Sequence, residues 1–193
     1  EDGQGLMGFY CNLLRQQAPE LLKMSRYLGV DAFFSKKSFV DTAIESGLHV
    51  ITRLRDDAVL HYAPPPKKEG QKGRPKKYGD RFSARNPDAE QLPCIAQTEG
   101  QRVYGGTAYV KSLKRMVKIA IIHELKEDGT VKSVKIFICT DLEFPAQDIW
   151  PWYKSRFQIE FLYRDAKQHT GLQDTQSRHP KALEYHFNMS LTA

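Results

Sequence analysis

Cysteine is scarce in this 193-residue sequence, and its three copies lie far apart. Cys11, Cys94 and Cys139 form no CxxC pair, and their number is odd, which argues against a disulfide framework and against a cysteine-based zinc site. The six histidines form neither an HxxxH nor an HExxH pattern, so they give no sign of a helical zinc site. A reducing cytoplasm fits this composition.

Long apolar runs and targeting signals are also missing. No apolar run approaches the roughly 20 residues that a membrane-spanning helix needs. The opening EDGQGLMGFYCNLLRQQ lacks the basic region and the cleavage site of a signal peptide. It also lacks an initiating Met, so we interpret the chain as part of something longer. We expect a cytoplasmic protein with no membrane partner.

Positive charge exceeds negative charge, and the excess is concentrated. The net charge of the chain is +6, and residues 63–82 carry seven basic against two acidic residues, or +5. A concentrated basic segment is typical of a protein that binds an anionic polymer. A solvated loop has the same composition, so charge alone leaves both interpretations open.

The N-terminal third predicts a βαβ unit. Helical apolar spacing covers residues 6–24, where we expect Pro19 to interrupt or restart the helix. A short strand then ends at Asp31. The stretch SKKSFVDTAIESG follows as a helix, with Ser35 as its N-cap and Gly47 at its C-terminus. The apolar, β-branched LHVITRLR is the second strand, which we expect to be parallel to the first.

The remaining sequence predicts a loop, a β-rich block and C-terminal helices. Residues 63–82 are rich in Pro, Gly and Lys and have no periodicity. Alternating or apolar segments follow over 102–140, with EDGT as a hairpin signal. We therefore divide the chain into a first part of the core, a basic and β-rich insertion, and the C-terminal core helices; the boundaries are 1–55, 56–145 and 146–193.

One predicted C-terminal helix carries a stripe of polar residues. If YKSRFQIEFLYRDAK is continuous, its basic, acidic and phenolic side chains share a face about 80° wide. These side chains are Tyr153, Arg156, Glu160, Arg164 and Lys167. A solvated face with i,i+4 ion pairs would look similar. The chemistry is nevertheless distinctive, because one carboxylate is surrounded by groups that bind phosphate well.

Two of these motifs together resemble a known family. Y-x2-R-x3-E-x6-K, from Tyr153 to Lys167, resembles the signature of the IS4-type DDE transposases of bacterial insertion sequences. Upstream, GVDAFFSKKSFVDTAIESGLHVITRLRDD resembles their second acidic motif. Both motifs stand in the family's order, with a β-rich insertion between them. The resemblance covers essentially the whole chain.

The resemblance implies an α/β, RNase H-like core and metal-dependent cleavage and transfer of DNA strands. Asp31 matches the second catalytic aspartate and Glu160 the glutamate, and both would bind Mg²⁺ or Mn²⁺. Two such metals can activate the attacking oxygen and stabilise the leaving oxygen. Tyr153, Arg156 and Lys167 would contact the DNA at the transposon end. Without the motif, Asp31 would be read as an ordinary strand-end aspartate.

The family's first aspartate has no counterpart that we can assign. Only 30 residues precede Asp31, and they predict a helix rather than the first core strands. We therefore expect a partial core and no strand cleavage by this chain alone. The implied partners are double-stranded DNA, as transposon ends and target, and a second copy in a synaptic complex when the protein is complete. The implied location is the bacterial cytoplasm, in association with the nucleoid.

The basic loop offers a second DNA contact. KGRPKKYG, with Arg74, Lys76 and Lys77, is similar to an AT-hook, in which an Arg-Pro segment lies in a narrow minor groove. Arg164 joins the other candidates by helix geometry only. An alternative interpretation is a DNA-binding remnant of a transposase without catalysis. A β-rich interaction domain without a nucleic-acid role is a third, which the clustered cations disfavour.

Overall fold

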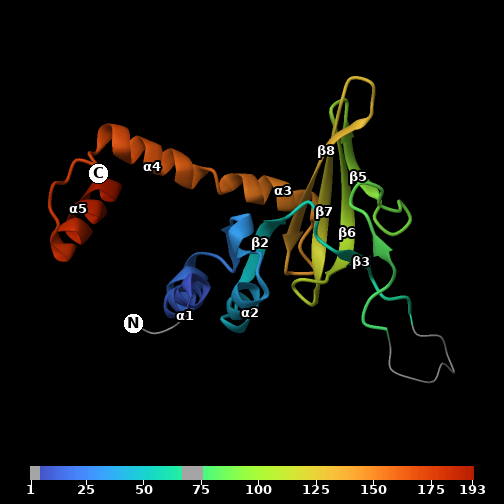
Figure 1. Ribbon diagram of the computed structural model, residues 1–193, viewed down its shortest axis with the longest axis horizontal. Helices are drawn as coiled ribbons and strands as arrows, with labels where there is room; N and C mark the ends of the chain where they lie inside the picture. The colour runs from blue at the N-terminus through green and yellow to red at the C-terminus, as the bar shows by residue number, and fades with distance from the viewer. Residues whose placement is uncertain (1–4, 67–75) are drawn as a thin grey trace. The chain divides into compact units, whose positions relative to one another are not determined.

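A computed structural model describes residues 5–66 and 76–193. These residues fall into two compact units, 1–153 and 154–193, and each unit is treated by itself below (Figure 1). The first unit is a mixed α/β structure built around one sheet. The second unit consists of helices.

The sheet of the first unit combines a parallel pair with antiparallel strands. Its strands run in the order β1-β2-β8-β7-β6-β3-β4, and β5 pairs with β6. Only β1 and β2 are parallel among the described strands; the other pairs are antiparallel. The strands are β1 (Tyr27–Val30), β2 (His49–Leu54), β3 (Leu60–Tyr62), β4 (Arg81–Phe82), β5 (Cys94–Thr98), β6 (Gln101–Val110), β7 (Arg115–Leu125) and β8 (Val131–Cys139).

The predicted βαβ unit is confirmed. A single 3-10 turn, η1 (Ala32–Phe34), and the helix α2 (Lys37–Glu45) connect the two parallel strands. The helix ends where it was expected to, because Gly47 has a φ of +84°, which glycine adopts without strain. The expected N-cap was wrong: Lys36 occupies that position, and the Ser35 hydroxyl instead donates to the Ala32 carbonyl of η1.

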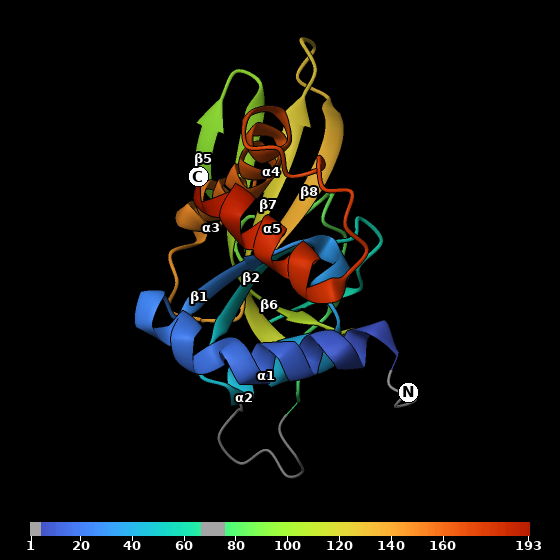
Figure 2. The same ribbon diagram turned by 90° about the vertical axis from the view of Figure 1, so that its left-hand side faces the viewer.

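The first helix, α1 (Leu6–Met24), is continuous. The prediction that Pro19 interrupts it was wrong. Pro19 is exposed, so water can solvate the carbonyl that loses its helical partner. The opposite side of α1 packs beside α2 and buries Cys11, Leu14 and Ala18 (Figure 2).

Alternation along the central strands divides the core into two clusters. In β7, Ile119 and Ile121 join the cluster that includes α1 and α2, whereas Ala120 and Ile122 join the cluster on the other face. This alternation follows from the two-residue period of a strand. The central strands are therefore buried on both faces, with helices α1 and α2 on one face and α3 (Ala146–Ser155) on the other.

The β-rich block continues the sheet of the βαβ unit. Strand β8 pairs antiparallel with β2, with Ile51 opposite Cys139. The EDGT hairpin is confirmed between β7 and β8, where Gly129 has a φ of +76°. The division into a core and an insertion at residue 55 stays a prediction.

The second unit contains α4 (Gln158–His169) and α5 (Pro180–Thr192). The continuous C-terminal helix assumed for the polar stripe was wrong, because α3 ends at Ser155 before α4 begins. Between them the backbone tightens: the Phe157 amide donates to the Lys154 carbonyl and the Glu160 amide to the Phe157 carbonyl. Within the described ranges, no helix combines the length and the apolar character that crossing a membrane requires.

Candidate functional site

Asp31 lies at the carboxyl end of β1, as the sequence predicted. Val30, the last residue of the strand, is opposite Thr52 of the parallel strand β2. Carboxyl ends of parallel strands meet at one edge of a sheet, which is where α/β proteins place their binding sites. This edge of the first unit is therefore the natural place for a carboxylate that acts in chemistry.

Two hydrogen bonds hold Asp31 in place. The Thr52 hydroxyl donates to the Asp31 carbonyl oxygen over 3.1 Å, which ties the residue to β2. The Phe33 amide donates to Oδ1 of Asp31 over 3.0 Å, so the carboxylate also caps η1. Asp31 nonetheless remains exposed. Its backbone is fixed while its carboxylate faces solvent.

The end of β2 brings basic residues to the same edge, but they have acidic partners. Nη2 of Arg53 lies 3.0 Å from Oδ1 of Asp56, and Nε of Arg55 lies 3.1 Å from Oδ1 of Asp57. Exposed pairs of this kind contribute little to stability. They can be exchanged for other partners at small cost, so both arginines stay available to an anionic ligand.

Helix α4 presents Glu160 with cations beside it. Nη2 of Arg156 lies 3.2 Å from Oε1 of Glu160, which is the i,i+4 ion pair that a solvated helix would also show. The Glu160 side chain is 56% exposed, so the pair leaves it open to a further ligand. Arg164 lies over the Phe161 ring and pairs with Asp165, and Lys167 is exposed.

Tyr153 differs from the other members of the predicted stripe. It is 5% exposed and packs against Phe137 and Trp150 in the core of the first unit. The placement of Tyr153 on an exposed polar face was wrong, because Tyr153 belongs to α3, which packs this ring against Phe137 of β8. Its contact with DNA stays a prediction. Because α3 ends at Ser155 and α4 begins at Gln158, the single helical wheel that aligned Tyr153 with Glu160 does not apply.

The basic loop is partly described. Lys76 and Lys77 are exposed, and Nζ of Lys77 lies 5.6 Å from the centre of the Tyr109 ring. Tyr78 stacks on the same ring at 4.6 Å. The predicted contacts of Arg74 lie outside the described residues. The C-terminal end of the loop is thus attached to β6, and its lysines face outward.

Asp141 is a buried carboxylate that the sequence analysis did not assign. Burial alone would raise its pKa, but hydrogen bonds from the Tyr27 hydroxyl, the Glu143 amide and the Arg26 guanidinium lower it to about 2. His49 lies 3.9 Å away. Asp141 follows β8, which runs antiparallel to β2, and its partners lie around the start of β1. It therefore lies at the opposite edge from Asp31 and fastens the sheet rather than the candidate site.

The chemistry of the two predicted ligands suits a hard divalent cation. Mg²⁺ and Mn²⁺ prefer carboxylate oxygens, and both Asp31 and Glu160 are exposed. No group of three or more His, Cys, Asp or Glu side chains that could hold a metal ion occurs in the part of the chain that the structure describes. Asp31 and Glu160 belong to different units. Their sharing of one metal cluster stays a prediction.

A comparison with family models identifies a matching family. The family described as DDE superfamily endonuclease matches residues 10–109, which is just over half of the 193 residues. The matched region contains Asp31, the whole βαβ unit and the basic loop. It ends before α4, so it does not include Glu160. No curated protein matches the chain.

Proposed function

Because this chain belongs to the DDE superfamily of endonucleases, we propose that it serves DNA transposition, as the catalytic region of an IS4-type transposase. The reaction is metal-dependent cleavage of DNA at the ends of a mobile element and transfer of the cut strand to a target. The partners are double-stranded DNA and, in the complete protein, a second copy.

The position of Asp31 carries this proposal. It follows a buried parallel strand, its backbone is fixed by Thr52, and its carboxylate is exposed at the edge where α/β sheets bind ligands. It also lies within the region that matches the endonuclease family. An aspartate that only forms a turn need not combine these features.

Asp31 and Glu160 would hold the divalent ion. When bound, Mg²⁺ or Mn²⁺ supplies Lewis-acid stabilisation of the oxygens that attack and leave the phosphate. The chain's own cations then hold the DNA backbone. Arg156, Arg164 and Lys167 lie in the same short segment as Glu160, and guanidinium groups bind phosphate oxygens in pairs. Tyr153 contributes through packing, because its ring is in the core.

A second candidate function is DNA binding without cleavage, as in a remnant of a transposase. It is supported by the number of acids that we can assign: two, where the family uses three. For the same reason we expect the 193-residue chain alone to bind DNA without nicking it. Nicking of a plasmid by the purified chain in Mg²⁺ would contradict this expectation.

Metal binding tests the assignment of the two carboxylates. Titration of Mn²⁺, followed by electron paramagnetic resonance, should show weaker binding by Asp31→Asn and by Glu160→Gln than by the unmodified chain. If the two groups share one ion, the double variant should lose little more than either single variant, because the effects of coupled residues do not add. Glu99→Gln removes an exposed charge elsewhere and is the matched control. Equal Mn²⁺ affinity in Asp31→Asn and the control would refute the metal role of Asp31.

A further inference from the structure

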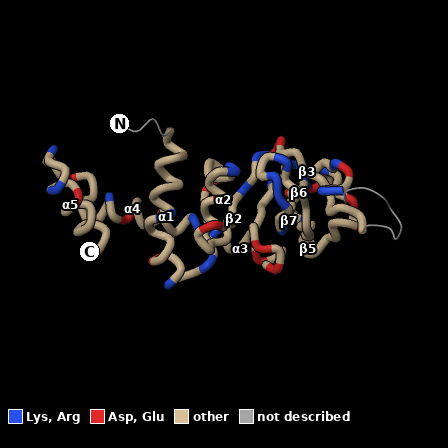
Figure 3. The backbone as a smooth tube through the Cα atoms, turned by 90° about the horizontal axis from the view of Figure 1, so that it is seen from below, with Lys and Arg blue, Asp and Glu red and all other residues tan. Residues whose placement is uncertain are grey.

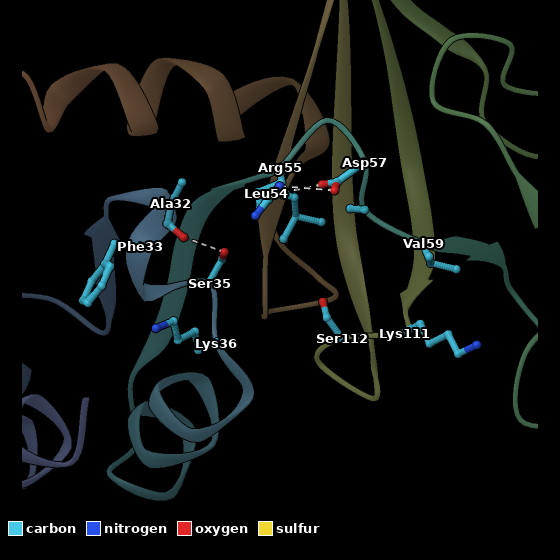
Figure 4. A pocket seen from close by; sticks show the side chains of 11 residues that line it. Ala32, Phe33, Ser35, Lys36, Leu54, Arg55, Asp57, Val59, Lys111 and Ser112 are labelled. Carbon is cyan, nitrogen blue, oxygen red and sulfur yellow. Dashed lines mark hydrogen bonds and ion pairs between the residues drawn. The ribbon is translucent and has the colours of Figure 1, made fainter. Parts of the chain in front are cut away.

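A groove within the first unit is lined in part by Ala32, the residue that follows Asp31 (Figure 4). Its volume is about 650 Å³, within the roughly 300–1,000 Å³ range of ligand-binding pockets. One wall is η1 with the two residues that precede α2, the floor is the end of β2 with the residues after it, and the other wall is the turn between β6 and β7. The lining residues used below are Lys36, Leu54, Arg55, Asp57, Val59, Lys111 and Ser112.

Each wall of the groove carries a lysine that has no acidic partner among the residues the structure describes. Lys36 lies on the α2 side and Lys111 on the β6–β7 side, and both are exposed. Within residues 5–66 and 76–193, neither ammonium group is in ion-pair contact with a carboxylate. The ammonium group of Lys36 lies over the Phe33 ring, 4.6 Å from its centre. In the close-up the ammonium end of Lys36 is turned toward Phe33 and that of Lys111 is turned outward, so the two cations border the groove at its rims (Figure 4). Exposed cations on both rims of one groove favour an anionic ligand with several charges that spans it.

The floor between the lysines is apolar. Leu54 lies between the two walls in the close-up and is 2% exposed, and Val59 lies on the side of Lys111 (Figure 4). A free inorganic anion would gain nothing from this floor. A ligand with charges at its edges and apolar sugar or base surface between them would use both features.

One carboxylate also lines the groove. Asp57 is paired with Arg55 through two contacts, of 3.1 and 3.3 Å. Both partners are exposed, so a competing anion can take over the guanidinium. Asp57 therefore reduces the attraction of this groove for an anion without abolishing it. Seen from below, Lys and Arg positions occur between α2 and β6 (Figure 3).

We infer that this groove binds the backbone of a DNA strand next to Asp31, with Lys36 and Lys111 as phosphate contacts. The inference rests on the proposed function, because it names where the DNA of that reaction lies. The groove adjoins Asp31 through the chain itself: Ala32, the next residue, is part of the lining. A strand in the groove would pass the carboxylate that the reaction requires.

The first test removes the two lysines. Fluorescence anisotropy of a short labelled oligonucleotide, single-stranded and then duplex, is measured over a series of NaCl concentrations with EDTA present. In Lys36→Ala/Lys111→Ala the slope of log affinity against log salt should fall by about 1.4 for the single strand and about 1.8 for the duplex, because each phosphate contact contributes about 0.7 or 0.9.

The matched control changes two exposed lysines far from the groove. Lys126 and Lys132 lie at the β7–β8 hairpin, which the 11 residues of β7 separate from the β6–β7 turn by about 33 Å. Lys126→Ala/Lys132→Ala lowers the net charge equally but should leave the slope nearly unchanged. An equal fall of this slope in the two double variants would refute DNA binding by the groove and would indicate only a general effect of charge.

A second test changes the acid of the groove. Asp57→Asn releases Arg55, so DNA affinity should rise by about tenfold, the effect of one added charge-assisted contact. Asp56→Asn removes the partner of Arg53 and adds the same net charge, but Asp56 does not line the groove. It should therefore give a smaller gain. A gain equal to that of Asp57→Asn counts against the groove.

A third test fills the groove without changing charge. Ser112→Trp should weaken DNA binding, while Ser112→Ala should not. Circular dichroism and thermal unfolding establish that both variants fold. Intact DNA binding by a folded Ser112→Trp protein would overturn the inference.

The outcomes separate the groove from the proposed function. If the unmodified chain binds DNA and all groove variants do so equally, the groove is refuted and the function stands on the Mn²⁺ results. If Asp31→Asn keeps full Mn²⁺ affinity while the groove variants weaken DNA binding, the metal assignment fails and the groove survives as a DNA-binding surface. If the unmodified chain binds no DNA at any salt concentration, both are refuted.

Discussion

The Tyr27 hydroxyl donates a hydrogen bond of 2.8 Å to Oδ2 of Asp141, although 114 positions separate the two residues. The Arg26 guanidinium lies 2.5 Å from the same oxygen. Burial and then the Asp141 carboxylate raise the pKa of Tyr27 above its usual value, so the phenol stays protonated as a donor. The start of β1 is thereby fastened to the residue that follows β8.

The first prediction concerns this carboxylate. In the folded protein the pKa of Asp141 is about 2, below the ordinary value of 3.8. Its contribution to stability is therefore complete above about pH 4 and is lost as the pH falls to about 2. Asp141→Asn should lower the free energy of unfolding by about 2 kcal/mol at neutral pH. The difference from the unmodified chain should narrow between pH about 4 and pH about 2.

Urea unfolding at a series of pH values measures this difference. Glu143→Gln is the control, because Glu143 donates only its backbone amide to Asp141 and its side chain is exposed. It should show no comparable loss. A pH-independent difference between Asp141→Asn and the unmodified chain would mean that the carboxylate charge is not what stabilises the sheet here.

The second prediction concerns Gly105 in β6. A Cβ at this position would lie 2.8 Å from the Cβ of Ala146 and 2.5 Å from Cδ1 of Ile95. Ala146 begins α3, so the helix approaches the strand closely where the side chain is absent. Gly105→Ala should lower stability by about 1–3 kcal/mol through overpacking. Gly29→Ala in β1 meets nothing within 4 Å and should be neutral or slightly stabilising in the same thermal unfolding experiment.

The third prediction separates packing from DNA contact at Tyr153. Because the ring is buried against Phe137, Tyr153→Ala should cost about 3–5 kcal/mol, whereas Tyr153→Phe keeps the ring and should cost far less. Tyr185→Ala, which removes a ring that is 68% exposed, is the control for the loss of an aromatic residue. If Tyr153→Phe is stable but its DNA affinity drops severalfold, the hydroxyl contacts DNA after all.

The fourth prediction concerns the basic loop. Changing its six clustered cations to Ala should flatten the salt dependence of duplex DNA binding, by about 0.9 for each phosphate contact that is lost. These cations are Lys67, Lys68, Lys72, Arg74, Lys76 and Lys77. Exchanging Lys for Arg and Arg for Lys at the same positions keeps the charge and should keep the slope. A slope unaltered by the Ala changes would show that the loop does not contact the DNA.

Local features of the fold could be predicted well. Helical and alternating periodicity are carried by neighbouring residues, so the βαβ unit, the terminal Gly47 and the EDGT hairpin followed directly from the sequence. The strand order could not be predicted in this way. The pairing of β2 with β8 joins segments about 85 residues apart, and no periodicity in either strand specifies its partner.

The same contrast between local and long-range information applies to the candidate site. The position of Asp31 at the end of a parallel strand depends on residues within one βαβ unit, and the prediction was right. The burial of Tyr153 depends on which strand lies beneath α3, and a helical wheel does not contain that information. The groove escaped notice because its cations come from separate segments, with Lys36 and Lys111 far apart in sequence.

The backbone closure at the base of the basic loop has an engineering consequence. The Gly79 amide donates to the Tyr62 carbonyl over 2.9 Å, and the Tyr62 amide donates to the Asp80 carbonyl over 3.0 Å. The two strands that flank the loop are therefore held together independently of what connects them. Since the entropy of closing a connection grows only slowly with its length, this position should accept an inserted tag or a foreign peptide without disturbing the rest of the protein.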